Sequence, residues 1–246
     1  MLAERYAEAA RGIIEQIARG QMETIRRAGQ AVADALLAEG AFWLYHIGHG
    51  GEIELRNRAG GLASAQVFDF RFEVSSPIAD ARRGRPRAES VDSDIEAARL
   101  AVRGSELRAG DALLLASVSG RNSVPVEVAL AAKDLGLTVI AITSLEYTAQ
   151  VESMHPSGKK LCDVADIVID NGAPFGDACV EADGYDHKIL PISGVAQIVI
   201  GWMICGEVIE RMTAAGKPPR VYQSLNRPGG PKDYEKVREQ YHETGY

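Results

Sequence analysis

Short apolar runs that alternate with helix-like segments constrain the fold of this chain more than any other feature. The runs are residues 41–47, 112–116, 137–143 and 165–170, and none is interrupted by a run of polar residues. A continuous apolar run of this length predicts a strand that is buried on both faces. Strands that alternate with helices predict a parallel sheet covered by helices on both sides, which is a three-layer, doubly wound α/β fold.

The flanking segments divide the chain into three expected parts. Residues 2–39 carry apolar side chains at helical spacing with a break near Gly20, which predicts an N-terminal helical arm over residues 1–39. Residues 40–216 form the expected α/β domain, which ends with an apolar helix over residues 195–212. After Gly216 the prolines and glycines exclude regular structure until about Lys232, so we expect residues 217–246 to pack on the domain or on a partner subunit.

Two segments depart from the alternation of strands and helices. Residues 71–89 are irregular and carry Arg82, Arg83, Arg85 and Arg87, which is typical of a solvated surface loop or of the lid of a cleft. Residues 178–190 alternate around Asp183-Gly184, which predicts a small hairpin after the fourth strand.

Charge and hydropathy exclude several classes of function. The formal net charge of −7 gives no support for nucleic-acid binding, which depends on basic surface. The N-terminus has no apolar stretch of signal-peptide length, and no window holds the roughly 18 uninterrupted apolar residues of a membrane span. We therefore expect a cytoplasmic protein with no membrane partner, and an anionic ligand would have to meet local donors.

The loop from Ser117 to Ser123 is the strongest candidate for a binding site. In an open parallel sheet the ligand crevice lies beyond the carboxyl ends of the strands, where this loop meets those that begin at Gly48 and Thr143. Small residues such as Gly120 let backbone N–H groups turn inward, and the following helix adds its positive end. The other donors are the hydroxyls of Ser117, Ser119 and Ser123, the amide of Asn122 and the guanidinium of Arg121. The alternative is an ordinary turn whose serine caps the helix.

Residues 113–120, 131–133, 136 and 139–144, with Gly48-His49-Gly50-Gly51 as a first glycine loop, resemble the core of sugar isomerase (SIS) domains. The resemblance covers most of residues 40–212 and is nearest to the phosphoheptose isomerase-like branch. It implies a phosphosugar ligand, and many members interconvert aldose and ketose phosphates or cleave sugar ethers. It also implies a homodimer or homotetramer. By this likeness the phosphate ligands are Ser117, Ser119, Asn122 and Ser123, and Thr143 and Ser144 line the pocket.

The sequence departs from that branch at its metal site and in its first loop. Glu52 stands where phosphoheptose isomerases carry a serine, and its carboxylate would repel a nearby phosphate. The metal-binding histidine and glutamate of the branch correspond to Arg58 and Gly61, and its late-helix histidines to Gln197 and Trp202. We therefore expect neither a metal nor another cofactor.

An isomerase that works through an enediol needs a general base and a donor for the developing oxyanion. Glu52 is the first candidate for the base, and the alternative is a charge that stabilises the start of a helix. His49, in the same loop, is the candidate donor. His46-x-x-His49 has metal-like spacing but no third ligand nearby.

Two further features carry donors without an assigned role. His187, in the expected hairpin, would either reach the site or lie on the surface, and residues 155–160 supply a histidine and two lysines to a loop. The sequence thus favours a phosphosugar isomerase without metal. A non-catalytic phosphosugar sensor and a sugar-phosphate lyase or etherase remain as alternatives.

Overall fold

The computed structural model describes residues 1–47, 49–86 and 92–246. A five-stranded parallel sheet with the order β2-β1-β3-β4-β5 forms its centre. The strands are β1 (Phe42–Ile47), β2 (Ala65–Val67), β3 (Ala112–Ala116), β4 (Thr138–Thr143) and β5 (Ile167–Asp170). The expected parallel sheet is therefore confirmed, with one additional strand, β2, at its edge.

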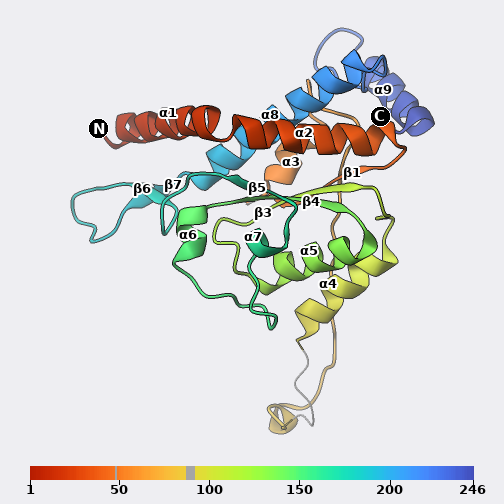
Figure 1. The fold of residues 1–246 in the computed structure, drawn as a ribbon. Coiled ribbons are helices and arrows are strands. Elements are labelled where there is room, and N and C mark those ends of the chain that lie inside the picture. The colour runs from red at the N-terminus through yellow and green to blue at the C-terminus, as the bar shows by residue number, and fades with distance from the viewer. Residues whose placement is uncertain (48, 87–91) are drawn as a thin grey trace.

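Helices cover both faces of this sheet, as Figure 1 shows. On one side lie α1 (Leu2–Gly20), α2 (Met22–Leu37), α3 (Gly51–Leu55) and α8 (Ser193–Ala214), and on the other α4 (Ser93–Gly104), α5 (Ser123–Leu135) and α7 (Leu161–Val164). The remaining helices are α6 (Leu145–Ala149), α9 (Gly230–Thr244) and the 3-10 turn η1 (Asp80–Arg82). This arrangement confirms the three-layer α/β class with N-terminal helices.

The strands contribute side chains to two hydrophobic cores, because successive side chains point to opposite faces of the sheet. In β3, Leu114 packs with α2 and α8, whereas Leu113 and Leu115 pack with α4 and α5. All five residues of β3 are buried. A strand that is covered on both faces can therefore be apolar throughout, which is the pattern that the sequence shows.

The longest helix, α8, lies in the core beside α2. A Cβ atom at Gly29 of α2 would come within 2.3 Å of Glu207 Cβ, so the two helices approach closely only because glycine stands there. By length and composition alone α8 could also cross a membrane. Its buried face, which includes Ile200, Ile204 and Val208, belongs to the hydrophobic core between the sheet and α2.

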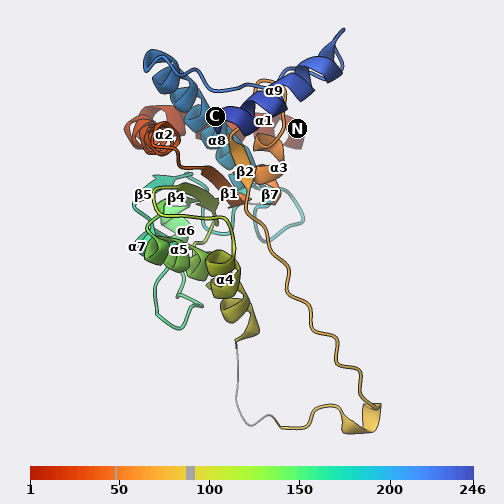
Figure 2. The ribbon, with the colours of Figure 1, turned by 90° about the vertical axis from the view of Figure 1, so that its right-hand side faces the viewer.

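The segments outside the sheet follow the expected pattern in part. β6 (Ala178–Val180) and β7 (Ile189–Pro191) form the expected antiparallel hairpin. The tail packs on its own chain, because Leu62 pairs with Val221 and Tyr222 N–H donates to the Gly61 carbonyl at 3.0 Å. Residues 71–86 form an exposed excursion that extends far from the sheet (Figure 2). Gly48 and Arg87, named above in the first loop and in the arginine-rich segment, lie outside the described residues.

Candidate functional site

The loop after β3 is held in a fixed shape by its neighbours. Ser117 is buried, and its N–H donates to the Ile142 carbonyl at 3.1 Å. Gly120 has a left-handed φ of +62° and closes a tight turn, in which its N–H donates to the Ser117 carbonyl at 3.1 Å. The carbonyls of Gly120 and Arg121 accept N–H groups of the chain beyond α6, at 2.8 and 2.9 Å. The loop is therefore ordered by hydrogen bonds that point its carbonyls toward protein.

Several hydrogen-bond donors of this loop have no acceptor among the described residues. Within the described part of the chain, the N–H groups of Ser119, Arg121 and Asn122 donate no hydrogen bond. The Nε atom of Arg121 is buried and also has no partner there. Helix α5 begins at Ser123, so the N–H groups of its first turn have no intrahelical acceptor and carry the positive end of the helix. Unpaired donors gathered at a helix start are suited to an anion.

A cavity of about 370 Å³ opens beside the start of α5. Asn122 and Ser123 line it together with Asp92 and Asp94 at the start of α4. The Ser123 hydroxyl donates to the Met154 carbonyl at 2.9 Å. On the α5 side of the cavity, the exposed Asn122 amide is therefore the side-chain polar group that makes no hydrogen bond with the described residues. The Asn122 amide and the carboxylates of Asp92 and Asp94 therefore line the same cavity.

Glu52 lies in a neighbouring, larger cavity of about 650 Å³. Its side chain is half-buried, and Oε2 accepts the Ile47 N–H at 2.9 Å. Ile47 lies opposite Ala116, the residue before Ser117, so the carboxylate is held at the carboxyl end of the sheet beside the loop. A second carboxylate, that of Asp69, lines the same cavity.

Tyr45 and His46 line both cavities, which are therefore neighbours. The pairing of β1 with β3 shifts register between Tyr45 and Ile47, and His46 has a left-handed φ of 45°. Such an irregularity turns a side chain away from its usual direction. The exposed imidazole of His46 therefore reaches the cavities, whereas His49 is exposed and lines neither of them.

The phenol of Tyr45 keeps its proton at neutral pH. Burial is the largest cause, and the nearby carboxylates of Asp69 and Glu52 act in the same direction, so the pKa of Tyr45 is raised to about 12. A phenol in this state is a hydrogen-bond donor between the two cavities. Tyr45 was not among the residues expected at the site, and His46 was considered only for the metal-like spacing of His46 and His49.

Thr143 and Ser144 were expected to line the pocket, and the structure places both in the interior with no exposed surface. The Thr143 hydroxyl donates to the Val118 carbonyl at 3.2 Å. The Ser144 hydroxyl donates to the Ala173 carbonyl at 2.5 Å and accepts the Tyr147 N–H at 3.0 Å as the cap of α6. These hydroxyls support the loop from behind and line neither of the two cavities.

Arg99, Glu127 and His155 form a network of polar side chains below the start of α5, which no sequence motif indicated. Glu127 of α5 accepts Arg99 Nε at 2.7 Å through Oε1, and its Oε2 lies 3.0 Å from His155 Nε2. The side chains of Glu127 and His155 are almost fully buried. Hydrogen bonds with Glu127 raise the pKa of Arg99. His155 thus anchors the loop 155–160, and with it Met154, against the start of α5.

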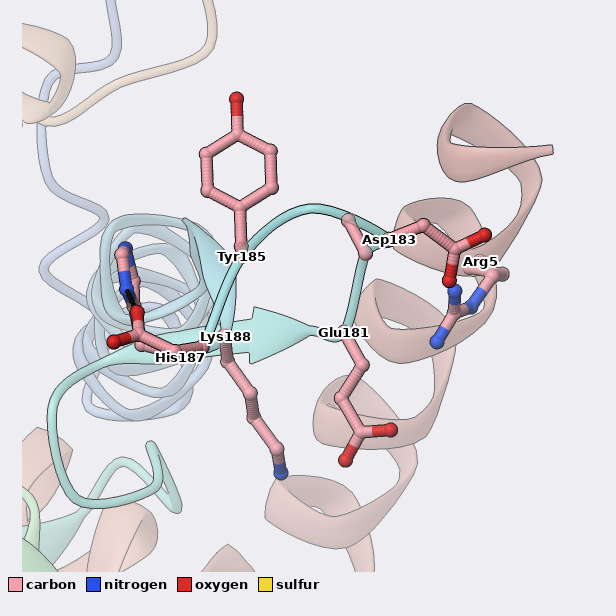
Figure 3. A pocket seen from close by; sticks show the side chains of 8 residues that line it. Arg5, Glu181, Asp183, Tyr185, His187 and Lys188 are labelled. Atoms are coloured by element: carbon pink, nitrogen blue, oxygen red, sulfur yellow. Dashed lines mark hydrogen bonds and ion pairs between the residues drawn. The ribbon is translucent and has the colours of Figure 1, made fainter.

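His187 lies in a separate hollow on the hairpin. Its Nδ1 is 2.7 Å from Asp186 Oδ1, and its ring lies edge-on to Tyr185. This hollow of about 420 Å³ shares no lining residue with the cavities of Glu52 and Asn122, and Figure 3 shows Arg5 of α1 beside it. The structure therefore places His187 away from the loop after β3.

The described residues hold no group of three or more His, Cys, Asp or Glu side chains that could bind a metal ion. Gln197 of α8 is 1% exposed, and neither of its amide atoms has a hydrogen-bond partner in the described residues.

Comparisons with known proteins agree with this architecture. The sequence model of the SIS domain family matches residues 5–144. A UPF0309 protein of Listeria innocua is 32% identical over 244 residues, which cover 98% of this chain and 96% of the relative. A UPF0309 protein of Caldanaerobacter subterraneus is 36% identical over 245 residues, which cover 98% and 97%.

Two solved structures share the fold. The phosphoheptose isomerase GmhA from Neisseria gonorrhoeae superposes with a TM-score of 0.53 and 15% identity, over 85% of this chain and 98% of that one. A phosphoheptose isomerase from Francisella tularensis gives a TM-score of 0.50 and 18% identity, over 84% and 95%. At these identities the likeness is one of fold.

Proposed function

The chain belongs to the SIS domain family, and from this premise we propose that it binds a sugar phosphate at the loop Ser117–Ser123. The observation that carries the proposal is the set of unpaired donors in this loop: the N–H groups of Ser119, Arg121 and Asn122 and the buried Nε of Arg121. Hydrogen bonds to a charged group contribute about 1.5–3 kcal/mol each. Three of them contribute about 5–9 kcal/mol before the costs of association, so micromolar affinity, about 8 kcal/mol, also requires contacts with the sugar.

The sugar would extend from this loop toward the carboxylates. Asp92 and Asp94 face the cavity of Asn122, and Glu52 and Asp69 face the adjoining one. A carboxylate accepts hydrogen bonds from sugar hydroxyls but repels a phosphate. This separation of donors from acceptors would orient the ligand with its phosphate at α5.

We further propose that the protein is an aldose/ketose phosphate isomerase with Glu52 as the general base, in a mechanism that needs no metal. The Ile47 N–H holds one oxygen of Glu52, and the other oxygen has no hydrogen bond within the described residues. His49 was the expected donor for the oxyanion. Because Tyr45 lines both cavities and keeps its proton, the geometry favours Tyr45 for this role.

Two observations favour other functions. Glu52 and Asn122 line different cavities that share Tyr45 and His46 as lining residues, which favours a sensor that binds a sugar phosphate without turnover. The second carboxylate beside Glu52, Asp69, supplies the acid–base pair that a lyase or etherase requires.

The experiment is a thermal-shift screen of triose to heptose phosphates and their unphosphorylated counterparts, followed by NMR of each stabilising compound for conversion. Stabilisation by the phosphates with an isomeric product supports the isomerase, and an elimination or hydrolysis product supports the lyase or etherase. Stabilisation without product supports the sensor. No selective shift with phosphorylated sugars would contradict phosphate binding itself.

We propose a cytoplasmic homodimer or homotetramer, built from the arm 1–39, the domain 40–216 and the tail 217–246. Analytical ultracentrifugation tests the oligomer. The packing of Leu62 against Val221 supports a tail that lies on its own domain.

A further inference from the structure

The segment after β2 has the sequence of a strand, but beyond Phe68 it pairs with no described residue. Apolar side chains alternate with charged ones at Phe68, Asp69, Phe70, Arg71, Phe72, Glu73 and Val74. Strict alternation with aromatic and β-branched residues predicts a strand with one apolar face. In the structure, β2 ends at Val67, and the chain continues as an extended segment.

Only the beginning of this segment is packed. Phe68 N–H donates to the Leu44 carbonyl at 2.9 Å, and the ring of Phe70 stacks on Tyr45 at 6.1 Å between centroids. Beyond that point the side chains of Phe72 and Val74 are 57% and 68% exposed. Residues 69–78 make no hydrogen bond with any described residue, and Figure 2 shows this leg running alone away from the sheet.

A strand of this kind is an open template for pairing. Its backbone N–H and C=O groups are unpaired, and it continues β2, which is itself the edge of the sheet. The exposed apolar side chains add a second reason for a partner, because extended apolar surface is costly in water.

The charges of the segment are complementary to those of a second copy of this chain. In an antiparallel pair with Phe72 opposite Phe72, a two-fold axis places Arg71 opposite Glu73 of the partner subunit, and Glu73 opposite the partner's Arg71. The same register places Phe70 opposite the partner's Val74. Opposite charges and aromatic–aliphatic pairs are the cross-strand neighbours that stabilise a sheet.

We propose that residues 70–74 pair antiparallel with the same residues of a second copy, with Phe72 on the two-fold axis. The pairing supplies an interface for the homo-oligomer proposed above and does not require a ligand. It also reaches the candidate site, because Asp69 and Arg71 line the cavity of Glu52. The partner's Glu73 would lie next to Arg71 at the rim of this cavity.

Disulfide cross-linking tests the register directly. Residues 72 of the two copies would have Cα atoms about 4.5–5.5 Å apart, within the range of a disulfide. Residues 74 would be about 14 Å apart, since each lies opposite residue 70. Mild oxidation should therefore link Phe72→Cys into a covalent dimer and leave Val74→Cys a monomer on non-reducing gels.

Val74→Cys is the matched control for Phe72→Cys, because both positions are exposed and lie two residues apart. Wild-type protein gives the background from its own free cysteines, Cys162, Cys179 and Cys205. Equal cross-linking of the two variants, or none with Phe72→Cys, would overturn the proposed register.

Charge reversal tests the interface without cysteines. Arg71→Glu and Glu73→Arg each place like charges opposite one another twice in the dimer, and each should raise the dissociation constant roughly tenfold in sedimentation experiments. The double variant restores both pairs and should return to the wild-type constant. Arg82→Glu, at the far end of the excursion, makes the same change of charge outside the pair and should have no effect.

Unchanged association in the single variants, or a double variant as weak as either of them, would overturn the proposal. Association is measured without any sugar phosphate, so its failure is distinct from a failure of ligand binding.

Discussion

Replacement of Gly120 by alanine tests whether the conformation of the loop after β3 is as tightly constrained as the structure indicates. The residue has a φ of +62°, which lies in the left-handed region that favours glycine. A Cβ atom there would lie 3.1 Å from Thr143 Oγ1 and 3.2 Å from Thr148 Oγ1. These two hydroxyl oxygens are themselves in contact at 3.2 Å, so neither can move without disturbing the other.

The expected cost follows from these two effects. An L-residue in the left-handed conformation costs roughly 1–2 kcal/mol. The crowding requires shifts of a few tenths of an ångström and acts in the same direction. For a chain of this size 1 kcal/mol lowers the melting temperature by about 2–4 °C, so Gly120→Ala should melt roughly 2–8 °C below the wild type.

Differential scanning calorimetry provides the measurement, and Gly12→Ala provides the control. Gly12 is exposed in α1, with nothing within 4 Å of the added Cβ atom, so alanine there should stabilise the helix by about 0.5–1 kcal/mol. If Gly120→Ala melts at or above the wild-type temperature, the argument from backbone conformation and crowding is wrong.

Three other substitutions address binding, turnover and pH. Ser119→Ala should weaken the binding of a sugar phosphate by about 1–3 kcal/mol in calorimetric titrations, and unchanged affinity would remove Ser119 from the site. Glu52→Gln should abolish conversion by NMR while the affinity stays the same, and a retained rate would exclude Glu52 as the base. The pKa of Tyr45 is raised to about 12, so the folded chain binds this proton more tightly than the unfolded chain. Stability should therefore be full below pH 10 and fall as the pH rises toward 12. Tyr45→Phe should remove part of that fall in urea unfolding, and an identical pH profile would contradict the assignment.

The parts of the fold that could be predicted from the sequence are the strands that are buried on both faces. β3 lies between two helical layers, so its composition alone identifies it. β2 is only three residues long and lies at the edge of the sheet, so it has no comparable signal.

The site was less predictable because it depends on side-chain directions and distant contacts. A register shift in β1 turns His46 toward the cavities, and apolar periodicity does not encode such a shift. Thr143 ends β4 as expected, but its hydroxyl donates to the Val118 carbonyl, 25 residues away in the chain. Glu127 and His155 form a contact although they lie 28 residues apart in the sequence, and no local sequence pattern predicts this contact.

The most direct test of the central claim is an NMR titration of the ¹⁵N-labelled protein with a sugar phosphate identified in the thermal-shift screen, and with the same sugar without phosphate. The amide signals of Ser119, Arg121 and Asn122, which have no acceptor in the described structure, should shift with the phosphorylated sugar and not with its counterpart. If these signals stay unchanged while others shift, the phosphate binds elsewhere and the proposed site is wrong.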